Sequence, residues 1–140
     1  MERKLPDQPE KRVELVEREL TGIVLGCFYD TYNILGFGFL ESVYKNALAF
    51  ELRAHGLRVE VEAKRPVYYK DHQVGLFKVD LLVEEKLALE LKATVVLGPT
   101  DKPQLLNFLK AGTLDVGLLL HYGPEPKFYR LVHPRFLFDQ

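Results

Sequence analysis

The hydrophobic period of the sequence changes from helical to strand spacing near residue 56, and no other feature restricts the fold as strongly. Before that point apolar residues recur at helical spacing, which predicts a long amphipathic helix over residues 10 to 35 and a second helix that ends at His55 and Gly56. Gly36 is expected to end the first helix, because glycine readily adopts the left-handed backbone found there. After that point "LRVEVEA" alternates apolar and polar residues, the period of a strand with one buried face.

The rest of the chain is predicted to form a sheet interrupted by one helix. After a break at Pro66, "PVYYKDHQVG" predicts a short strand with a turn around Asp71 and His72. "LFKVDLLV" and "LALELKATVV", joined by the polar "EEK", predict an antiparallel hairpin. A third helix follows, with Asp101 as its candidate cap, and then two strands, "DVGLLLHY" and "KFYRLV". This order predicts an α/β or α+β fold with helices against a mixed sheet.

Length and composition limit the function classes. A chain of 140 residues suits one domain, so we expect a flexible lead-in over residues 1–9 and a single domain over residues 10–140. The 19 basic and 20 acidic residues give a net charge of −1, which excludes a strongly basic nucleic-acid coat. No apolar run is long enough to cross a bilayer and the charged N-terminus lacks a secretory signal, so we predict a cytoplasmic protein without a membrane partner.

Cysteine and histidine do not follow a metal-binding spacing. Cys27 is the only cysteine, which excludes an internal disulfide and a four-cysteine cluster. The four histidines are scattered, and neither His-x-x-x-His nor a Cys/His spacing occurs, so a structural zinc site is not expected. His121, at the end of a central strand, is the one histidine that we keep as a site candidate.

The predicted hairpin carries the most unusual polar residues of the chain. Strand alternation places Glu90, Lys92 and Thr94 on one face, and the hairpin brings Asp80 beside Glu90. Two carboxylates with a nearby ammonium suit a hard divalent ion such as Mg²⁺ or Mn²⁺. An alternative stays open from the residues alone: Glu90 and Lys92 face solvent, and Asp80 pairs with Lys78 or Lys92.

These motifs together resemble the PD-(D/E)XK nuclease superfamily. Its members place an Asp and then Glu-X-Lys across a hairpin in an αβββαβ core of restriction-endonuclease type, here with an extra long N-terminal helix. "GFLESVY" further resembles the Gly-x-x-Glu-x-x-Tyr signature of the GxxExxY family, through Gly38, Glu41 and Tyr44. "KVDLLVEEKLALELKA", "QLLNFLKAGTLDVGLLL" and the glycine of "HYG" follow that family's order, so the resemblance covers roughly residues 15 to 132.

The resemblance implies a metal site with a catalytic lysine. Asp80 and Glu90 would be the principal metal ligands, with the carbonyl of Leu91 as a third. Lys92 would position or activate the attacking water. Glu41 would face the sheet and assist the metal or its waters.

A further motif and two departures complete the resemblance. Gln104 matches the glutamine of a Gln-x-x-x-Tyr motif that contacts the site or the nucleic acid, but the tyrosine of that motif is Phe108 here. "HYG" replaces the more usual Asn-Phe-Gly. Without the resemblance, Glu41 is a favourable first-turn charge, Tyr44 is a core aromatic residue and Gln104 solvates a helix start.

The predicted function is metal-dependent hydrolysis of phosphodiester bonds, with DNA favoured over RNA as the nucleic acid. Basic and aromatic residues, among them Lys64, Arg65, Lys70, Tyr68 and Tyr69, can grip single strands or simply form solvated strand faces. The alternative is a non-catalytic module that keeps a nuclease-like fold and binds nucleic acid or protein. A homodimer through the long first helix is the remaining possibility.

Overall fold

The computed structural model describes residues 17–138. Its elements, in chain order, are α2 (Arg18–Leu35), α3 (Glu41–Ala54), β1 (Val59–Tyr69), β2 (His72–Val83), β3 (Leu87–Lys92), α4 (Asp101–Gly112), β4 (Val116–Tyr122), β5 (Pro126–Val132) and α5 (Arg135–Phe138). The predicted lead-in over residues 1–9 and the predicted start of the first helix at residue 10 lie outside the described residues.

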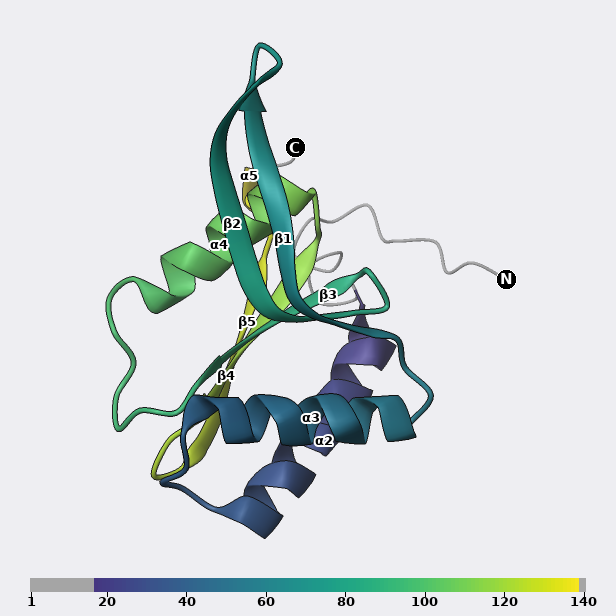
Figure 1. Ribbon diagram of the computed structural model, residues 1–140, viewed down its shortest axis with the longest axis vertical. Coiled ribbons are helices and arrows are strands. Elements are labelled where there is room, and N and C mark those ends of the chain that lie inside the picture. Colours follow the sequence, from purple (N-terminus) through teal and green to yellow (C-terminus); the bar gives the residue numbers. More distant parts are fainter. Residues whose placement is uncertain (1–16, 139–140) are drawn as a thin grey trace.

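The strands form one mixed sheet in the order β1-β2-β3-β4-β5 (Figure 1). Neighbouring strands are antiparallel except β3 and β4, which are parallel. The parallel pair requires a crossover, and α4 supplies it. The predicted mixed sheet with flanking helices, of the restriction-endonuclease type, is therefore confirmed.

Helices cover both faces of the sheet and create two apolar cores. On one face α2 and α3 pack over residues that include Leu81, Leu89, Leu91, Leu118 and Tyr122. On the other face α4 packs over Ala63, Val79, Leu82, Ala88 and Leu119. Both sides of β3 and β4 are thus buried, as expected of central parallel strands.

The sequence predicted a break at Pro66, but strand β1 continues through this residue. It runs from Val59 through Pro66 to Tyr69 and pairs with β2 along this length. β1 is an edge strand, where a proline does not remove a ladder hydrogen bond from the sheet. The predicted turn at Asp71 is confirmed, and the β1–β2 hairpin projects beyond the rest of the sheet (Figure 1).

Strand β3 is shorter than predicted. It ends at Lys92, and the side chains of Val95 and Val96 are exposed in the loop that follows. Thr94 therefore does not continue the face of Glu90 and Lys92, and its hydroxyl instead donates to the Val96 carbonyl at 2.8 Å. Within residues 17–138 no helix is long and apolar enough to span a membrane.

Candidate active site

Strands β2 and β3 stop pairing just before the two predicted metal ligands. Their ladder ends at the pair Leu81 and Leu89, so Asp80 and Glu90 would have formed the next pair. Beyond this point β3 continues beside β4. The two strands therefore diverge here, and the two carboxylates lie where the strands begin to separate.

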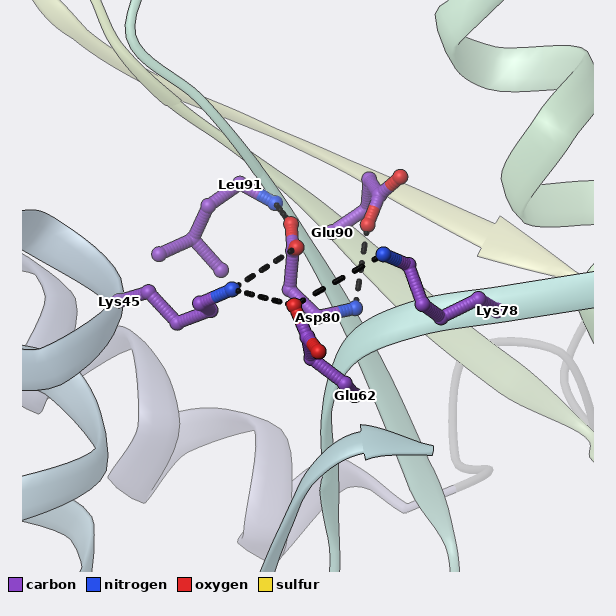
Figure 2. Close-up of polar contacts among 6 residues, drawn as sticks. All are labelled: Lys45, Glu62, Lys78, Asp80, Glu90 and Leu91. Carbon is purple, nitrogen blue, oxygen red and sulfur yellow. Dashed lines mark hydrogen bonds and ion pairs between the residues drawn. The ribbon is translucent and has the colours of Figure 1, made fainter. Parts of the chain in front are cut away.

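The carboxylates replace the hydrogen bonds that the separating strands no longer exchange. The N–H of Asp80 donates to Glu90 Oε1 at 3.2 Å, and the N–H of Leu91 donates to Asp80 Oδ2 at 2.8 Å (Figure 2). In an extended strand the N–H and C=O of one residue point to the same edge, so the Leu91 carbonyl faces the same gap. Two carboxylates and a main-chain carbonyl form an all-oxygen donor set.

The electrostatics of the acid pair favour a nearby cation. Burial, a hydrogen bond to the Asp80 carboxyl group and its charge raise the pKa of Glu90 to about 8, while Lys92 acts in the opposite direction. Burial and the charge of Asp80 also raise the pKa of Glu41. The raised pKa values of Glu90 and Glu41 show that their ionised forms are under-stabilised beside Asp80, and a divalent ion would stabilise those forms.

Lys45 is a cation of this site that sequence reasoning missed. Its Nζ lies 3.1 Å from Glu62 Oε1 and 4.0 Å from Asp80 Oδ1, and Lys78 approaches the same Glu62 oxygen at 3.7 Å (Figure 2). Burial works to lower the pKa of Lys45, but the hydrogen bond to Glu62 and the charges of Asp80, Glu62 and Glu41 raise it overall. Its spacing of four residues from Glu41, on one helix face, was the available signal.

Gly38 and Tyr44 shape the turn that precedes Glu41 at the start of α3. Gly38 has φ 120°, a conformation that side-chain-bearing residues rarely adopt. The Tyr44 hydroxyl donates to the Gly36 carbonyl at 2.5 Å and accepts from the Phe39 N–H at 3.2 Å. The Tyr44 ring is fully buried, so it acts as a core aromatic residue that fixes the turn before Glu41.

One alternative from the sequence paired Lys92 with Asp80, but Lys92 pairs with Asp101 instead. Its Nζ lies 3.6 Å from Asp101 Oδ1, at the start of α4. Asp101 is buried, and its Oδ2 accepts the Gly98 N–H at 2.7 Å. The expected helix cap at Asp101 is thus wrong: Thr100 holds the N-cap position and Asp101 is the first helical residue.

The remaining candidates lie farther from the acids or serve the core. Gln104 is exposed in the first turn of α4, three residues after Asp101, and among the described contacts its side chain makes none with Asp80 or Glu90. Phe108 is fully buried in the core under α4. His121 is buried, and its Nε2 lies 2.6 Å from the Thr94 carbonyl, so it anchors the loop after β3.

Comparisons with known proteins bear on the family and the fold of the chain. The family model of the PD-(D/E)XK nuclease superfamily matches residues 18–131, a span that holds every predicted site residue. The crystal structure of SSO0001 superposes with a TM-score of 0.50 at 16% sequence identity, and the alignment covers 99% of this chain and 76% of that chain. This likeness concerns the fold alone. No curated protein matches the sequence. The chain belongs to the PD-(D/E)XK nuclease superfamily.

Proposed function

We propose that this protein is a metal-dependent nuclease that hydrolyses phosphodiester bonds of nucleic acid. The observation that carries the proposal is the meeting of Asp80, Glu90 and the Leu91 main chain where β2 and β3 separate. Membership of a nuclease superfamily supports a nucleic-acid substrate. DNA is the preferred substrate in this proposal, and the cytoplasm is the compartment.

The metal is Mg²⁺ or Mn²⁺, since nucleases of this superfamily generally depend on divalent ions. Asp80, Glu90 and the Leu91 carbonyl would hold it, because hard cations prefer oxygen donors. When bound, such an ion polarises the phosphate and lowers the pKa of a coordinated water. The raised pKa of Glu90 supports this assignment, because a divalent ion would stabilise the ionised carboxylate.

The side chains around the ion have separate tasks. Lys92 orients the attacking water and offsets the negative charge that grows on the phosphate, since its ammonium can donate to both. Glu41 accepts hydrogen bonds from waters at the mouth of the site. Gln104, exposed on the first turn of α4, contacts the nucleic acid rather than the ion.

The Gly38, Glu41 and Tyr44 pattern supports the finer assignment to the GxxExxY branch of the superfamily. In this chain each of the three has a structural reason: Gly38 has a positive φ, Tyr44 fixes the preceding turn, and Glu41 is the residue so presented. These roles support the assignment, because the pattern lies directly before and within the helix that carries Glu41.

Metal binding is the first test, because it needs no assumption about the substrate. We expect Mn²⁺ to bind the wild-type chain saturably in calorimetry and the Asp80→Ala/Glu90→Ala double variant not to bind. Glu85→Gln, in the exposed turn of the same hairpin, is the matched control and should bind as the wild type does. Equal binding by wild type and double variant would refute the metal site.

Cleavage is the second test. Single- and double-stranded DNA and RNA would be incubated with wild-type protein and Mn²⁺ or Mg²⁺, beside Lys92→Ala. We expect metal-dependent cleavage that falls on the order of 100-fold or more in the variant, the usual effect of losing a group that handles the attacking water. An unchanged rate in a folded variant would remove Lys92 from the mechanism.

One observation favours a second candidate function. Lys45 Nζ already lies 4.0 Å from Asp80 Oδ1, so an ammonium group partly stabilises the ionised acids of this site. A non-catalytic module could use this built-in cation and bind nucleic acid without metal. Binding that needs no divalent ion and survives Glu90→Gln would favour this alternative.

A further inference from the structure

A second cluster of metal-ligating side chains lies between α2 and α3, where a cysteine of one helix meets an acid and a histidine of the other. Cys27 comes from α2, Glu51 from α3, and His55 caps the C-terminus of α3. One ligand atom of each lies within 4.8 Å of the other two. In Figure 1 the two helices cross against the same face of the sheet. Glu51 and His55 are four residues apart on one helix, and the packing of α2 against α3 adds Cys27 to them.

Two of the three ligand-to-ligand distances are close to those around a tetrahedral ion of the zinc class. Cys27 Sγ lies 3.6 Å from His55 Nδ1. With Zn–S of about 2.3 Å and Zn–N of about 2.0 Å, a tetrahedral angle requires a sulfur–nitrogen separation of about 3.5 Å. Glu51 Oε1 lies 3.9 Å from His55 Nδ1, and a small rotation of this half-buried side chain would bring it to the roughly 3.4 Å that a tetrahedral N–O edge needs.

The surroundings suit a site with one open position. Cys27 is 1% exposed and lies at the buried end of the cluster. The side chains of Glu51 and His55 are 33% and 47% exposed and lie at its solvent side. A fourth ligand can therefore come from water. The thiolate and imidazole donors select zinc-class ions over Mg²⁺ or Mn²⁺, so this site would not compete with the acid site for the same metal.

We propose that Cys27, Glu51 and His55 form a binding site for a zinc-class divalent ion that links α2 to α3. Binding exchanges protons in a defined way. Without metal, His55 Nδ1 donates to the Glu51 carbonyl at 3.0 Å, and burial together with the charges of Glu51 and Asp30 raises the pKa of the Cys27 thiol to about 11. On binding, the imidazole proton resides on Nε2 and the thiol proton is released to solvent.

Co²⁺ is the probe, because a thiolate bound to Co²⁺ gives a charge-transfer absorption that oxygen ligands alone do not give. Titration of the full chain should produce this band with saturation at one equivalent, and Zn²⁺ should displace it. His55→Ala and Glu51→Gln are expected to weaken Co²⁺ binding by at least about tenfold, since each removes one of three protein ligands. Both residues are partly exposed, so these variants test the site even if Cys27→Ala fails to fold.

Two controls separate this site from others. His72→Ala changes an exposed histidine in the β1–β2 hairpin and should leave the band unchanged. Asp80→Ala/Glu90→Ala should also leave it unchanged, so the outcome does not depend on the nuclease proposal. Zn²⁺ should raise the unfolding temperature of the wild type and not that of His55→Ala. Absence of a thiolate band at saturating Co²⁺, or a band unchanged in His55→Ala and Glu51→Gln, would overturn the proposal.

Discussion

Lys92 and Asp101 form an ion pair of 3.6 Å that joins the end of β3 to the start of α4. Asp101 is 9% exposed and is itself held by the Gly98 N–H. The pair therefore restricts the reach of the Lys92 side chain and directs it from the α4 side of the sheet. A lysine that must meet both a water and a phosphate gains from such restriction, because orientation is a large part of catalytic power.

Asp101→Asn should lower the cleavage rate by about tenfold, which corresponds to ~1.4 kcal/mol of transition-state stabilisation. Asparagine keeps an oxygen for the Gly98 N–H but loses the charge that holds Lys92. The effect should appear in kcat rather than in KM, measured under saturating Mn²⁺. Asp115→Asn, which disrupts the ion pair with Arg135 at the start of α5, is the control and should cleave at the wild-type rate.

The Glu90 carboxyl group makes stability depend on pH in a defined direction. Its pKa is about 8 in the folded protein and about 4.3 in an unfolded chain, so between these values the folded state binds more protons. The metal-free protein should therefore lose stability as the pH rises from about 4.5 to about 8. Urea unfolding across this range measures the effect, and Glu90→Gln should flatten the curve. A wild-type curve that rises with pH throughout would contradict the assignment.

Divalent ions should reverse this trend. An ion bound at Asp80 and Glu90 stabilises the ionised carboxylates, so saturating Mn²⁺ should stabilise the wild type more at pH 8 than at pH 6. Glu90→Gln should show no such difference. Equal stabilisation at both pH values would mean that the ion does not interact with Glu90.

Gly38→Ala should destabilise the protein by about 1–3 kcal/mol, because φ 120° strains any residue with a Cβ. Gly22→Ala is the matched control: it lies inside α2, where a Cβ meets nothing within 4 Å. There alanine should stabilise by about 0.5–1 kcal/mol through its higher helix propensity. Thermal unfolding of both variants tests whether Gly38→Ala lowers and Gly22→Ala raises the stability of the protein. Equal effects would show that the turn before Glu41 tolerates a side chain.

Short-range patterns were enough to predict the acid pair. Alternation along β3 and the polar turn after β2 placed Asp80 opposite Glu90. Both signals are local, because each involves residues within about a dozen positions of each other. The same reasoning predicted the mixed sheet. It failed at Pro66, because whether a strand tolerates proline depends on its place at the edge of the sheet.

Contacts between distant elements could not be predicted in this way. Lys45 reaches Asp80 only because α3 packs over the sheet, and Asp101 reaches Lys92 only because α4 lies on the opposite face. The same holds for Cys27 and His55, which are 28 residues apart in the chain. A single sequence carries the side chains of such clusters but not the packing that brings them together.

Lys45 distinguishes the two proposed functions most directly. Its ammonium opposes a divalent ion at Asp80, so Lys45→Met, which keeps the length of the side chain but removes its charge, should tighten Mn²⁺ binding. Opposition between like charges a few ångströms apart near a protein surface is worth enough to change the dissociation constant by on the order of tenfold. Lys78→Met is the matched control, because Lys78 pairs with Glu62 rather than with Asp80 and is exposed on β2. If Lys45→Met leaves Mn²⁺ binding unchanged and instead abolishes metal-free binding of nucleic acid, Lys45 serves as the working cation, and the non-catalytic function replaces the nuclease.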